Sequence, residues 1–489
     1  MKKQVIFYFL TLVSLCGVGQ DTVFHYFVGT SGIETSVAIF ENGGYVDVFG
    51  STGGAGSGQS DIYCVRMSST FEPFDFVTIG SQGIEKLEAV IMLDELEGYA
   101  ILYTAYDGFG DKGYYARLEK LDSSLLPQQS VPIYGEANHI PVDIATDGDN
   151  IFTLTEIETS GMYTYKVSIF DLNLDLGHEF IISKVDSMVL ESIFINDEII
   201  VVGTHKFADS SYSDVLILKY SLDGELLQES SFGTEHNDIG SSVISVADTA
   251  YLVTGSTNGY LGEDFDVYLV KLDTSLNIIW EQIHGHNPFV DNKDEFGVNS
   301  LVGFDGKIYV GLTSSTYGEG KEDFHVYQLN DSGQYEIGNS FGLESTELMS
   351  EIVQFSDSTY TMIGSTNSIG VFGLKDIFVV STRVIHSGPP KVYTSVKDTI
   401  SRMNVTGVSK HEEVNPLAEI IQKGAVVELN SNVKSYLNGQ LYDLSGHLIS
   451  SFQFSDIYNL DMNNLPSGLY VLVLNSFVEE PQVFRFIRY

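Results

Sequence analysis

Five aspartates stand at almost the same distance behind a glycine that ends an apolar run. They are Asp61, Asp214, Asp266, Asp323 and Asp376, which follow Gly50, Gly203, Gly255, Gly311 and Gly364 by 11, 11, 11, 12 and 12 residues. Such regular spacing indicates one shared role. Their carboxylates could bind calcium, because hard cations prefer carboxylate and carbonyl oxygens. They could also accept hydrogen bonds from loop N–H groups and so fix the start of a strand. No loop fits the Asp-x-Asp-x-Asp-Gly calcium template, so we predict the structural role and keep calcium as the alternative.

Other chemistry has weaker support in the sequence. His284 and His286 could lie on one side of a strand, but no third metal ligand accompanies them. There is no Gly-x-Ser-x-Gly nucleophile motif, and Cys64 lies in a β-patterned run, which favours a buried hydrophobic role. Acid pairs for glycoside cleavage stay open, since they are defined by their separation in space. We therefore assign no catalytic residue, no cofactor and no metal ligand beyond the calcium alternative.

The aspartates belong to a unit of about fifty residues that repeats seven times between Tyr26 and Ile385. The clearest unit contains four short apolar or alternating runs, which predict four strands: 242–246, 251–255, 266–272 and 277–283. Brief turns join the first two and the last two runs, as expected for antiparallel neighbours. A single sheet of this kind cannot cover its own faces, whereas sheets packed around an axis can. The repeat therefore predicts a seven-bladed β-propeller over residues 20–386.

Two features of the repeat are irregular. The second and third units lack the glycine, and Tyr103 and Leu154 fall close to its place. The last unit supplies no fourth strand, while the run Val23–Val28 has no unit of its own. We predict that this run completes the last sheet and closes the ring, which removes a free strand edge.

The order of turns and loops predicts which side of the ring binds partners. If the short turns lie on one side, the loops after each glycine and after each outermost strand lie together on the other. These loops are long and acidic, for example 257–264 and 313–322. Binding sites are usually formed by such loops on a rigid scaffold.

Composition and the two ends of the chain limit its environment. Twenty-five basic and 66 acidic residues give a net charge of −41, which excludes nucleic acid as a partner.

The first residues predict a signal peptide over residues 1–19. They contain Lys2 and Lys3, an apolar run and the small-x-small pattern Gly17-Val18-Gly19. No later segment has the length of a membrane-spanning helix. Residues 387–424 are expected to be a linker with a short helix near 412–422, followed by a small β-domain over 425–489.

Two resemblances add to these predictions. The fifth unit, with Gly255-Ser256-Thr257-Asn258 and the run 266–273, resembles the repeats of secreted bacterial seven-bladed propellers. The last domain resembles the type A sorting domain of the type IX secretion system in its motif residues Tyr442, Asp443, Gly446, Leu465, Pro466, Gly468 and Tyr470. That resemblance implies an immunoglobulin-like β-sandwich that an outer-membrane translocon recognises. The family usually opens this domain with Tyr-Pro-Asn-Pro, of which only Asn415-Pro416 is present.

The resulting hypothesis is an exported protein, secreted or held at the outer cell surface, that acts as a binding or adhesion module. We expect a monomer whose acidic loop face binds a glycan, a peptide or a cationic surface. The alternative is an extracellular hydrolase or lyase that acts on polysaccharides or peptides at the same face. A purely structural surface component is a third reading.

Overall fold

The computed structural model consists of strands joined by turns and loops, and it contains no helix among the residues it describes. It describes residues 5–488 apart from 16–21, 31, 57, 70, 72, 95–96, 107–113, 134–137, 160–161, 183–186, 207–211, 248, 260–263, 286–292, 319–320, 357, 368–374, 383–397, 406–417, 424–425, 432–436, 444–447, 456, 462–467 and 476–481. Within these residues no helix is long and apolar enough to cross a membrane. The chain divides into two compact units, Met1–Val405 and Thr406–Tyr489.

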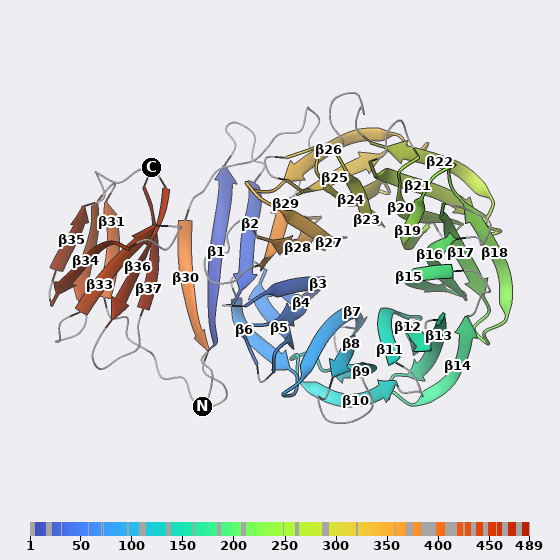
Figure 1. Cartoon of the computed structure of the whole chain (residues 1–489), viewed down its shortest axis with the longest axis horizontal. Helices are drawn as coiled ribbons and strands as arrows, with labels where there is room; N and C mark the ends of the chain where they lie inside the picture. Colours follow the sequence, from blue (N-terminus) through green and yellow to red (C-terminus); the bar gives the residue numbers. More distant parts are fainter. Residues whose placement is uncertain are drawn as a thin grey trace. The chain divides into compact units, whose positions relative to one another are not determined.

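The first unit is a ring of seven antiparallel sheets, which we call blades 1–7 (Figure 1). The strands of each blade are given from the innermost outward. Blade 1 contains β3 (Glu34–Asn42), β4 (Tyr45–Thr52), β5 (Asp61–Ser68) and β6 (Pro73–Ile79), and blade 2 contains β7 (Ile84–Asp94), β8 (Gly98–Tyr106), β9 (Tyr115–Leu121) and β10 (Pro127–Ile133). Blade 3 contains β11 (Asn138–Thr146), β12 (Asn150–Thr159), β13 (Met162–Asp171) and β14 (Leu176–Ile182). Blade 4 contains β15 (Ser187–Asn196), β16 (Glu198–Lys206), β17 (Asp214–Tyr220) and β18 (Leu226–Phe232), and blade 5 contains β19 (Asp238–Val246), β20 (Ala250–Thr257), β21 (Asp266–Asp273) and β22 (Ile278–His284). Blade 6 contains β23 (Glu295–Val302), β24 (Ile308–Ser314), β25 (Asp323–Leu329) and β26 (Tyr335–Phe341). The prediction of an all-β, seven-bladed propeller is confirmed.

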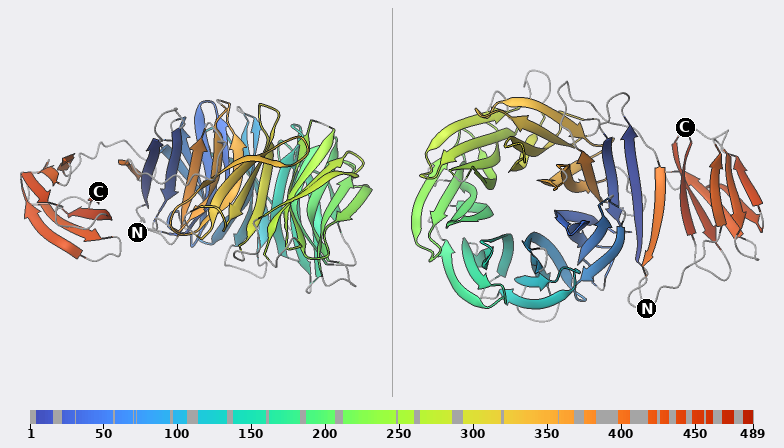
Figure 2. Two further views of the ribbon diagram at one scale, coloured as in Figure 1. Left: turned by 90° about the horizontal axis from the view of Figure 1, so that it is seen from above. Right: turned by 180° about the vertical axis from the view of Figure 1, so that it is seen from behind.

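Blade 7 combines both ends of the repeat region. It contains β27 (Glu347–Gln354), β28 (Tyr360–Thr366), β29 (Asp376–Thr382) and, as fourth strand, β2 (Thr22–Gly29). β2 pairs antiparallel with β29, so that Tyr26 faces Val379 and Phe27 faces Phe378. The predicted closure by the run Val23–Val28 is therefore confirmed, and Figure 2 shows the closed ring from the opposite side.

Two more strands extend blade 7 beyond β2. β1 (Val5–Leu15) pairs with β2, and β30 (Asp398–Val405) pairs with β1, both antiparallel. β1 lies inside the segment predicted as a signal peptide, and β30 lies inside the expected linker 387–424. The removal of residues 1–19 stays a prediction.

Packing between blades buries both faces of the middle strands. Every residue of β20 and of β25 is buried, as expected for strands covered by a sheet on each side. The cluster between blades 6 and 7 joins Phe324, Met362, Phe378 and Phe27, so β2 contributes directly to the core. Cys64 is fully buried between blades 1 and 2, as predicted.

In four blades, the repeated glycine packs against the bulged part of the innermost strand. Gly255 pairs with Gly240 just before the extra residue of β19, and a Cβ on Gly255 would lie 2.0 Å from the Ile239 carbonyl oxygen. Gly50, Gly203 and Gly364 meet a carbonyl oxygen of their own innermost strand at 2.1 Å in the same way. Real Cβ atoms do not approach so closely, so these positions require glycine. In blades 2, 3 and 6 the same register position holds Tyr103, Thr155 and Leu312 beside an equivalent bulge. The residue of blade 3 is therefore one place after the expected Leu154, and Gly311 of blade 6 lies one place before this position.

The second unit is made of two antiparallel sheets. One contains β31 (Ala418–Lys423), β32 (Val426–Ser431) and β35 (Ile457–Asp461), and the other β34 (Leu448–Phe454), β33 (Leu437–Asp443), β36 (Gly468–Asn475) and β37 (Gln482–Arg488). Leu429 and Leu460 of the first sheet and Leu441 and Phe454 of the second are buried. This is the two-sheet composition of the predicted small β-sandwich. The helix expected near 412–422 is wrong where the structure describes it, because Ala418–Lys423 pairs with β32 as a strand and this pairing overrides local helix preference.

Candidate functional site

Every innermost strand of the ring has a bulge at an equivalent place. There the register skips one position, which leaves as bulge residues Val37, Glu88, Val142, Glu191, Ser241, Val298 and Ser350. β7 has a second register shift, between Met92 and Asp94. A bulge re-aims the side chain of its extra residue. Three of these residues, Val37, Glu88 and Ser350, line one pocket on the inner strands of blades 1, 2 and 7.

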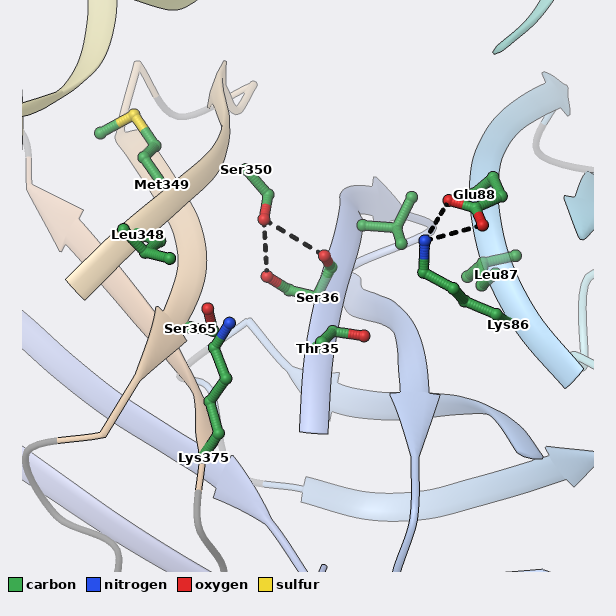
Figure 3. A pocket seen from close by; sticks show the side chains of 11 residues that line it. Thr35, Ser36, Lys86, Leu87, Glu88, Leu348, Met349, Ser350, Ser365 and Lys375 are labelled. Carbon is green, nitrogen blue, oxygen red and sulfur yellow. Dashed lines mark hydrogen bonds and ion pairs between the residues drawn. The ribbon is translucent and has the colours of Figure 1, made fainter. Parts of the chain in front are cut away.

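This pocket, which we call the axial pocket, lies between β27, β3 and β7 and has a volume of about 390 Å³ (Figure 3). Its polar lining consists of hydroxyl groups and of two lysines and one glutamate: Thr35, Ser36, Ser350, Ser365, Lys86, Lys375 and Glu88. Leu87, Leu348 and Met349 add apolar surface. A concave site with apolar walls and a few convergent polar groups is typical of small-ligand binding.

The axial pocket lies on the side of the ring that carries the long loops. Backbone hydrogen bonds join the loops that follow second strands to those that follow outermost strands, as from Gly53 N–H to Ile33 O and from Asn258 N–H to Asn237 O. The two loop sets therefore share one face, as the turn lengths predict. The pocket residues Thr35 and Lys86 stand near the starts of β3 and β7, next to those loops.

Lys375 is the most informative residue of the pocket. Its ammonium group has no hydrogen-bond or ion-pair partner among the residues that the structure describes, and burial lowers its pKa. Lys86, in contrast, pairs with Glu88 at 2.8 Å. In a chain with 66 acidic residues, a lysine without a counter-charge inside a pocket indicates room for an anionic group from outside.

The hydroxyl groups of the axial pocket are held in place across the junction of blades 7 and 1. The Ser350 hydroxyl lies 3.0 Å from that of Ser36 and donates to the Ser36 carbonyl oxygen at 3.2 Å (Figure 3). Both residues lie at bulges, where the strand ladder leaves backbone and side chain available. A ligand would therefore meet a fixed row of hydroxyl groups beside Lys375.

Two acids next to the bulge residues hold neighbouring blades together. Glu351 Oε2 accepts the Ile39 N–H at 3.1 Å across the closure, and Asp143 Oδ2 accepts the Ile193 N–H at 2.8 Å between blades 3 and 4. Burial raises the pKa of Glu351 to about 8 and that of Asp143 to about 6. These side chains bond backbone groups, which fits a structural role between blades.

The raised pKa of Glu351 predicts a loss of stability in alkali. Its pKa is about 8 in the folded protein and about 4.3 when the chain is unfolded, so the folded state retains the proton between these values. The free energy of unfolding should therefore fall as the pH rises from about 4 to about 8, and this contribution should be lost above that pH. Glu351→Gln removes the charge but keeps an oxygen for the Ile39 N–H, so it should be more stable than wild type at pH 9 and flatten the profile. Urea unfolding at pH 6 and pH 9 measures the change in the free energy of unfolding, and Glu235→Gln, at an exposed position, is the control. An equal change between the two pH values for the wild type and Glu351→Gln would contradict the prediction.

The five predicted aspartates lie at equivalent places, each as the first residue of a third strand. In the structure, each of these aspartates lies next to a second acid that was not identified from the sequence. This second acid is the first residue of the innermost strand of the next blade. The pairs are Asp61 with Glu85, Asp214 with Asp238, Asp266 with Glu295, Asp323 with Glu347, and Asp376 with Glu34. In every pair the N–H of the second acid donates to the carbonyl oxygen of the residue before the aspartate, at 2.6–2.9 Å. A glycine five residues before the second acid, as in Gly80 and Glu85, could have identified this acid in the sequence. Four of the five pairs have such a glycine.

The second acids also fix the loop that precedes them. The Ser81 hydroxyl donates to Glu85 at 2.6 Å, the Leu343 N–H to Glu347 at 2.8 Å, and Thr30 bonds Glu34. Asp61 accepts the Gly58 N–H at 2.9 Å, which is the loop bond predicted for a structural aspartate. A structural task is therefore visible for both acids of a pair.

The sorting-motif residues fall partly within the described chain. Tyr442 and Asp443 lie in β33, and Gly468 and Tyr470 lie in β36. These strands pair so that Asp443 faces Tyr470 and Tyr442 faces Val471. The two halves of the motif are therefore adjacent, whereas Gly446, Leu465 and Pro466 lie outside the described residues.

Comparison with known proteins gives likeness of fold only. No family model matches the chain, and no curated protein matches it. Among solved structures, the β-propeller domain of the Trilobed protease from Pyrococcus furiosus is 14% identical, with a TM-score of 0.44 over 74% of this chain and 96% of that chain. An acylaminoacyl peptidase is 12% identical, with a TM-score of 0.41 over 68% of this chain and 49% of its own. A puromycin hydrolase is 10% identical, with a TM-score of 0.46 over 81% of this chain and 58% of its own. The chain spans about half the length of these two enzymes, and the assignment of its fold depends on its own strand pairing.

Proposed function

We propose that this chain is an exported binding module whose axial pocket binds an acidic saccharide. The observation that carries the proposal is Lys375, a pocket lysine that pairs with no acid in the described part of the chain and lies beside the hydroxyl groups of Ser36, Ser350 and Ser365. A uronic acid offers a carboxylate for the ammonium group and several hydroxyl groups for the serines. Among the partners expected from the sequence, this choice favours a glycan over a cationic surface.

The proposed binding depends on one charge, which gives a direct test. Lys375→Gln should weaken the binding of an oligogalacturonate by about tenfold to a hundredfold, because hydrogen bonds between charged groups contribute about 1.5–3 kcal/mol. Isothermal titration calorimetry measures the affinity, and added salt should weaken binding to the wild type.

The matched control is Lys307→Gln, which removes an exposed lysine that pairs with Glu336 in blade 6. This variant should bind like the wild type. Equal affinities of the wild type and Lys375→Gln, or equal binding of the uncharged oligosaccharide of the same length, would contradict the proposal.

The hydrolase or lyase alternative has less support from the pocket. Glycoside hydrolysis usually needs two carboxyl groups that flank the scissile bond. The described lining of the axial pocket contains one, Glu88, which pairs with Lys86 and whose pKa is raised by burial. The calorimetric samples should also be assayed for shortened oligosaccharides, since product release would favour the alternative.

Export completes the proposed function. The signal-peptide pattern at residues 1–19 and the sorting-domain motif support delivery to the outer cell surface or the medium through a type IX translocon. Support comes from the sequence motifs and from the adjacent positions of Asp443 and Tyr470 in β33 and β36. Expression of the full chain, with and without residues 425–489, in a bacterium that has this translocon tests whether the last domain directs export.

A further inference from the structure

The junctions between blades contain either two facing acids or none. Five junctions carry one of the pairs described above. At the other two, the register positions are occupied by Tyr115 and His139 between blades 2 and 3, and by Thr164 and Met188 between blades 3 and 4. Neither of these junctions contains a single acid at the equivalent positions. If each acid only stabilised its own loop, some junctions would be expected to contain the first acid without the second, or the second without the first. The joint presence of both acids therefore indicates a shared role.

The acids of a pair approach the same point in space. A Cβ on Gly80 would lie 2.0 Å from Asp61 Oδ1 and 2.9 Å from Glu85 Oε2. At Gly233 the corresponding distances are 2.3 Å to Asp238 Oδ2 and 3.1 Å to Asp214 Oδ1. At the junction of blades 1 and 2 both acids are buried, and buried carboxylates that approach one point repel each other unless a proton or a cation lies between them.

The junction of blades 7 and 1 contains oxygens without a partner. Glu34 has a relative exposure of 0%, and its Oε1 accepts the Thr52 hydroxyl at 2.8 Å, whereas its Oε2 has no hydrogen-bond partner. The hydroxyl of Tyr63, also at 0% exposure, has none either. The Glu34 N–H donates to the carbonyl oxygen of Lys375, the residue before Asp376, at 2.9 Å, so both acids stand at this junction. Burial, together with the charges of Glu34 and Asp376, raises the pKa of Tyr63.

The junction of blades 5 and 6 repeats this arrangement. Glu295 is 1% exposed and its Oε1 lies 3.3 Å from the Ser314 hydroxyl, while its Oε2 has no partner. Burial raises the pKa of Glu295 to about 7. The nearby hydroxyl of Tyr327 is buried and has no partner.

We propose that a divalent hard cation, calcium in the first place, binds between blades 7 and 1 at Glu34, Asp376 and Tyr63, and between blades 5 and 6 at Glu295 and Asp266. The ligands are oxygens, which is the set that calcium prefers. The positive charge would neutralise a buried pair of carboxylates, and water would complete the coordination shell. The ions would hold adjacent blades together. The site between blades 7 and 1 borders the axial pocket, because Glu34 and Asp376 adjoin the pocket residues Thr35 and Lys375, so it is tested by unfolding and by terbium emission and not by saccharide binding.

Thermal unfolding of the full chain tests the proposal. Calcium should raise the Tm by several degrees relative to buffer with EDTA, because a ligand that binds only the folded state stabilises it. The double variant Glu34→Gln/Glu295→Gln should lose this rise, while the exposed Asp149→Asn should keep it. An unchanged Tm of the wild type in calcium and in EDTA would overturn the proposal, as would a full calcium response of the double variant. A gain in stability of the double variant that is the same with and without calcium would show instead that each pair shares a proton.

A second measurement keeps the test informative if the double variant does not fold. Terbium binds calcium sites and emits when a tyrosine beside it absorbs light. Terbium emission should appear with the wild type, decrease when calcium is added, and be weaker in Tyr63→Phe, which keeps both carboxylates and the aromatic ring. Emission that calcium does not displace, or that Tyr63→Phe does not reduce, would contradict the site between blades 7 and 1.

Discussion

Phe27→Asp should unfold the propeller. Phe27 is 4% exposed in β2, its ring lies 5.1 Å from that of Phe378, and it belongs to the core between blades 6 and 7. Loss of a buried phenylalanine costs about 3–5 kcal/mol, and an unpaired carboxylate in its place adds a desolvation penalty. The sum approaches the whole free energy of unfolding of an ordinary domain, about 5–15 kcal/mol. We therefore expect a Tm at least ten degrees lower, or no folded protein at all.

The control for this experiment is Phe304→Asp, since Phe304 is 68% exposed in a turn of blade 6. Circular dichroism melting and size-exclusion chromatography of both variants measure the effect. A Phe27→Asp protein that melts within two or three degrees of Phe304→Asp would show that β2 does not hold the ring closed.

The second large effect is expected for Gly255→Ala. The added Cβ would lie 2.0 Å from the Ile239 carbonyl oxygen and 3.3 Å from Gly240 Cα, both of which are backbone atoms of the bulged strand β19. Because backbone atoms in a paired strand cannot move aside as a flexible side chain can, we expect a loss of about 3 kcal/mol, at the upper end of the cost of overpacking. Urea unfolding monitored by the single tryptophan, Trp280 in the outermost strand β22 of the same blade, measures the loss.

Gly177→Ala is the matched control for Gly255→Ala. Gly177 also lies in a strand, but its Cβ would meet a single atom, Ile169 O, at an ordinary contact distance of 3.6 Å. It should change stability little. Equal unfolding midpoints for the two variants would contradict the explanation of the repeated glycine as a consequence of the bulge.

The ring could be predicted from the sequence because its marks are local. Gly50, Gly203, Gly255 and Gly364 lie beside bulges within their own blades, so four of the seven blades carry the same local mark in the sequence. The remaining blades are recognised by their apolar runs and by the period of about fifty residues. The closure was predictable because Val23–Val28 had no partner in its own unit. β31 was not recognised because its pairing with β32 outweighs the helix-like composition around it.

The sites could be predicted only in part, because they form between blades. Thr35, Lys86 and Lys375 share the axial pocket although Lys375 is more than 280 residues from the other two in the sequence. Only the closure through β2 brings them together. The spacing of Asp61 and its equivalents was visible in the sequence, but their acidic partners belong to the next repeat, and a search within one repeat does not find them.

The pairing of β2 with β29 also sets the order in which the molecule can assemble. β2 is synthesised about 350 residues before its partner β29, so blade 7 is the last blade to complete. Contacts between such distant segments form slowly. Until β2 pairs with β29, blade 7 lacks its fourth strand and the ring has an unpaired strand edge at β29.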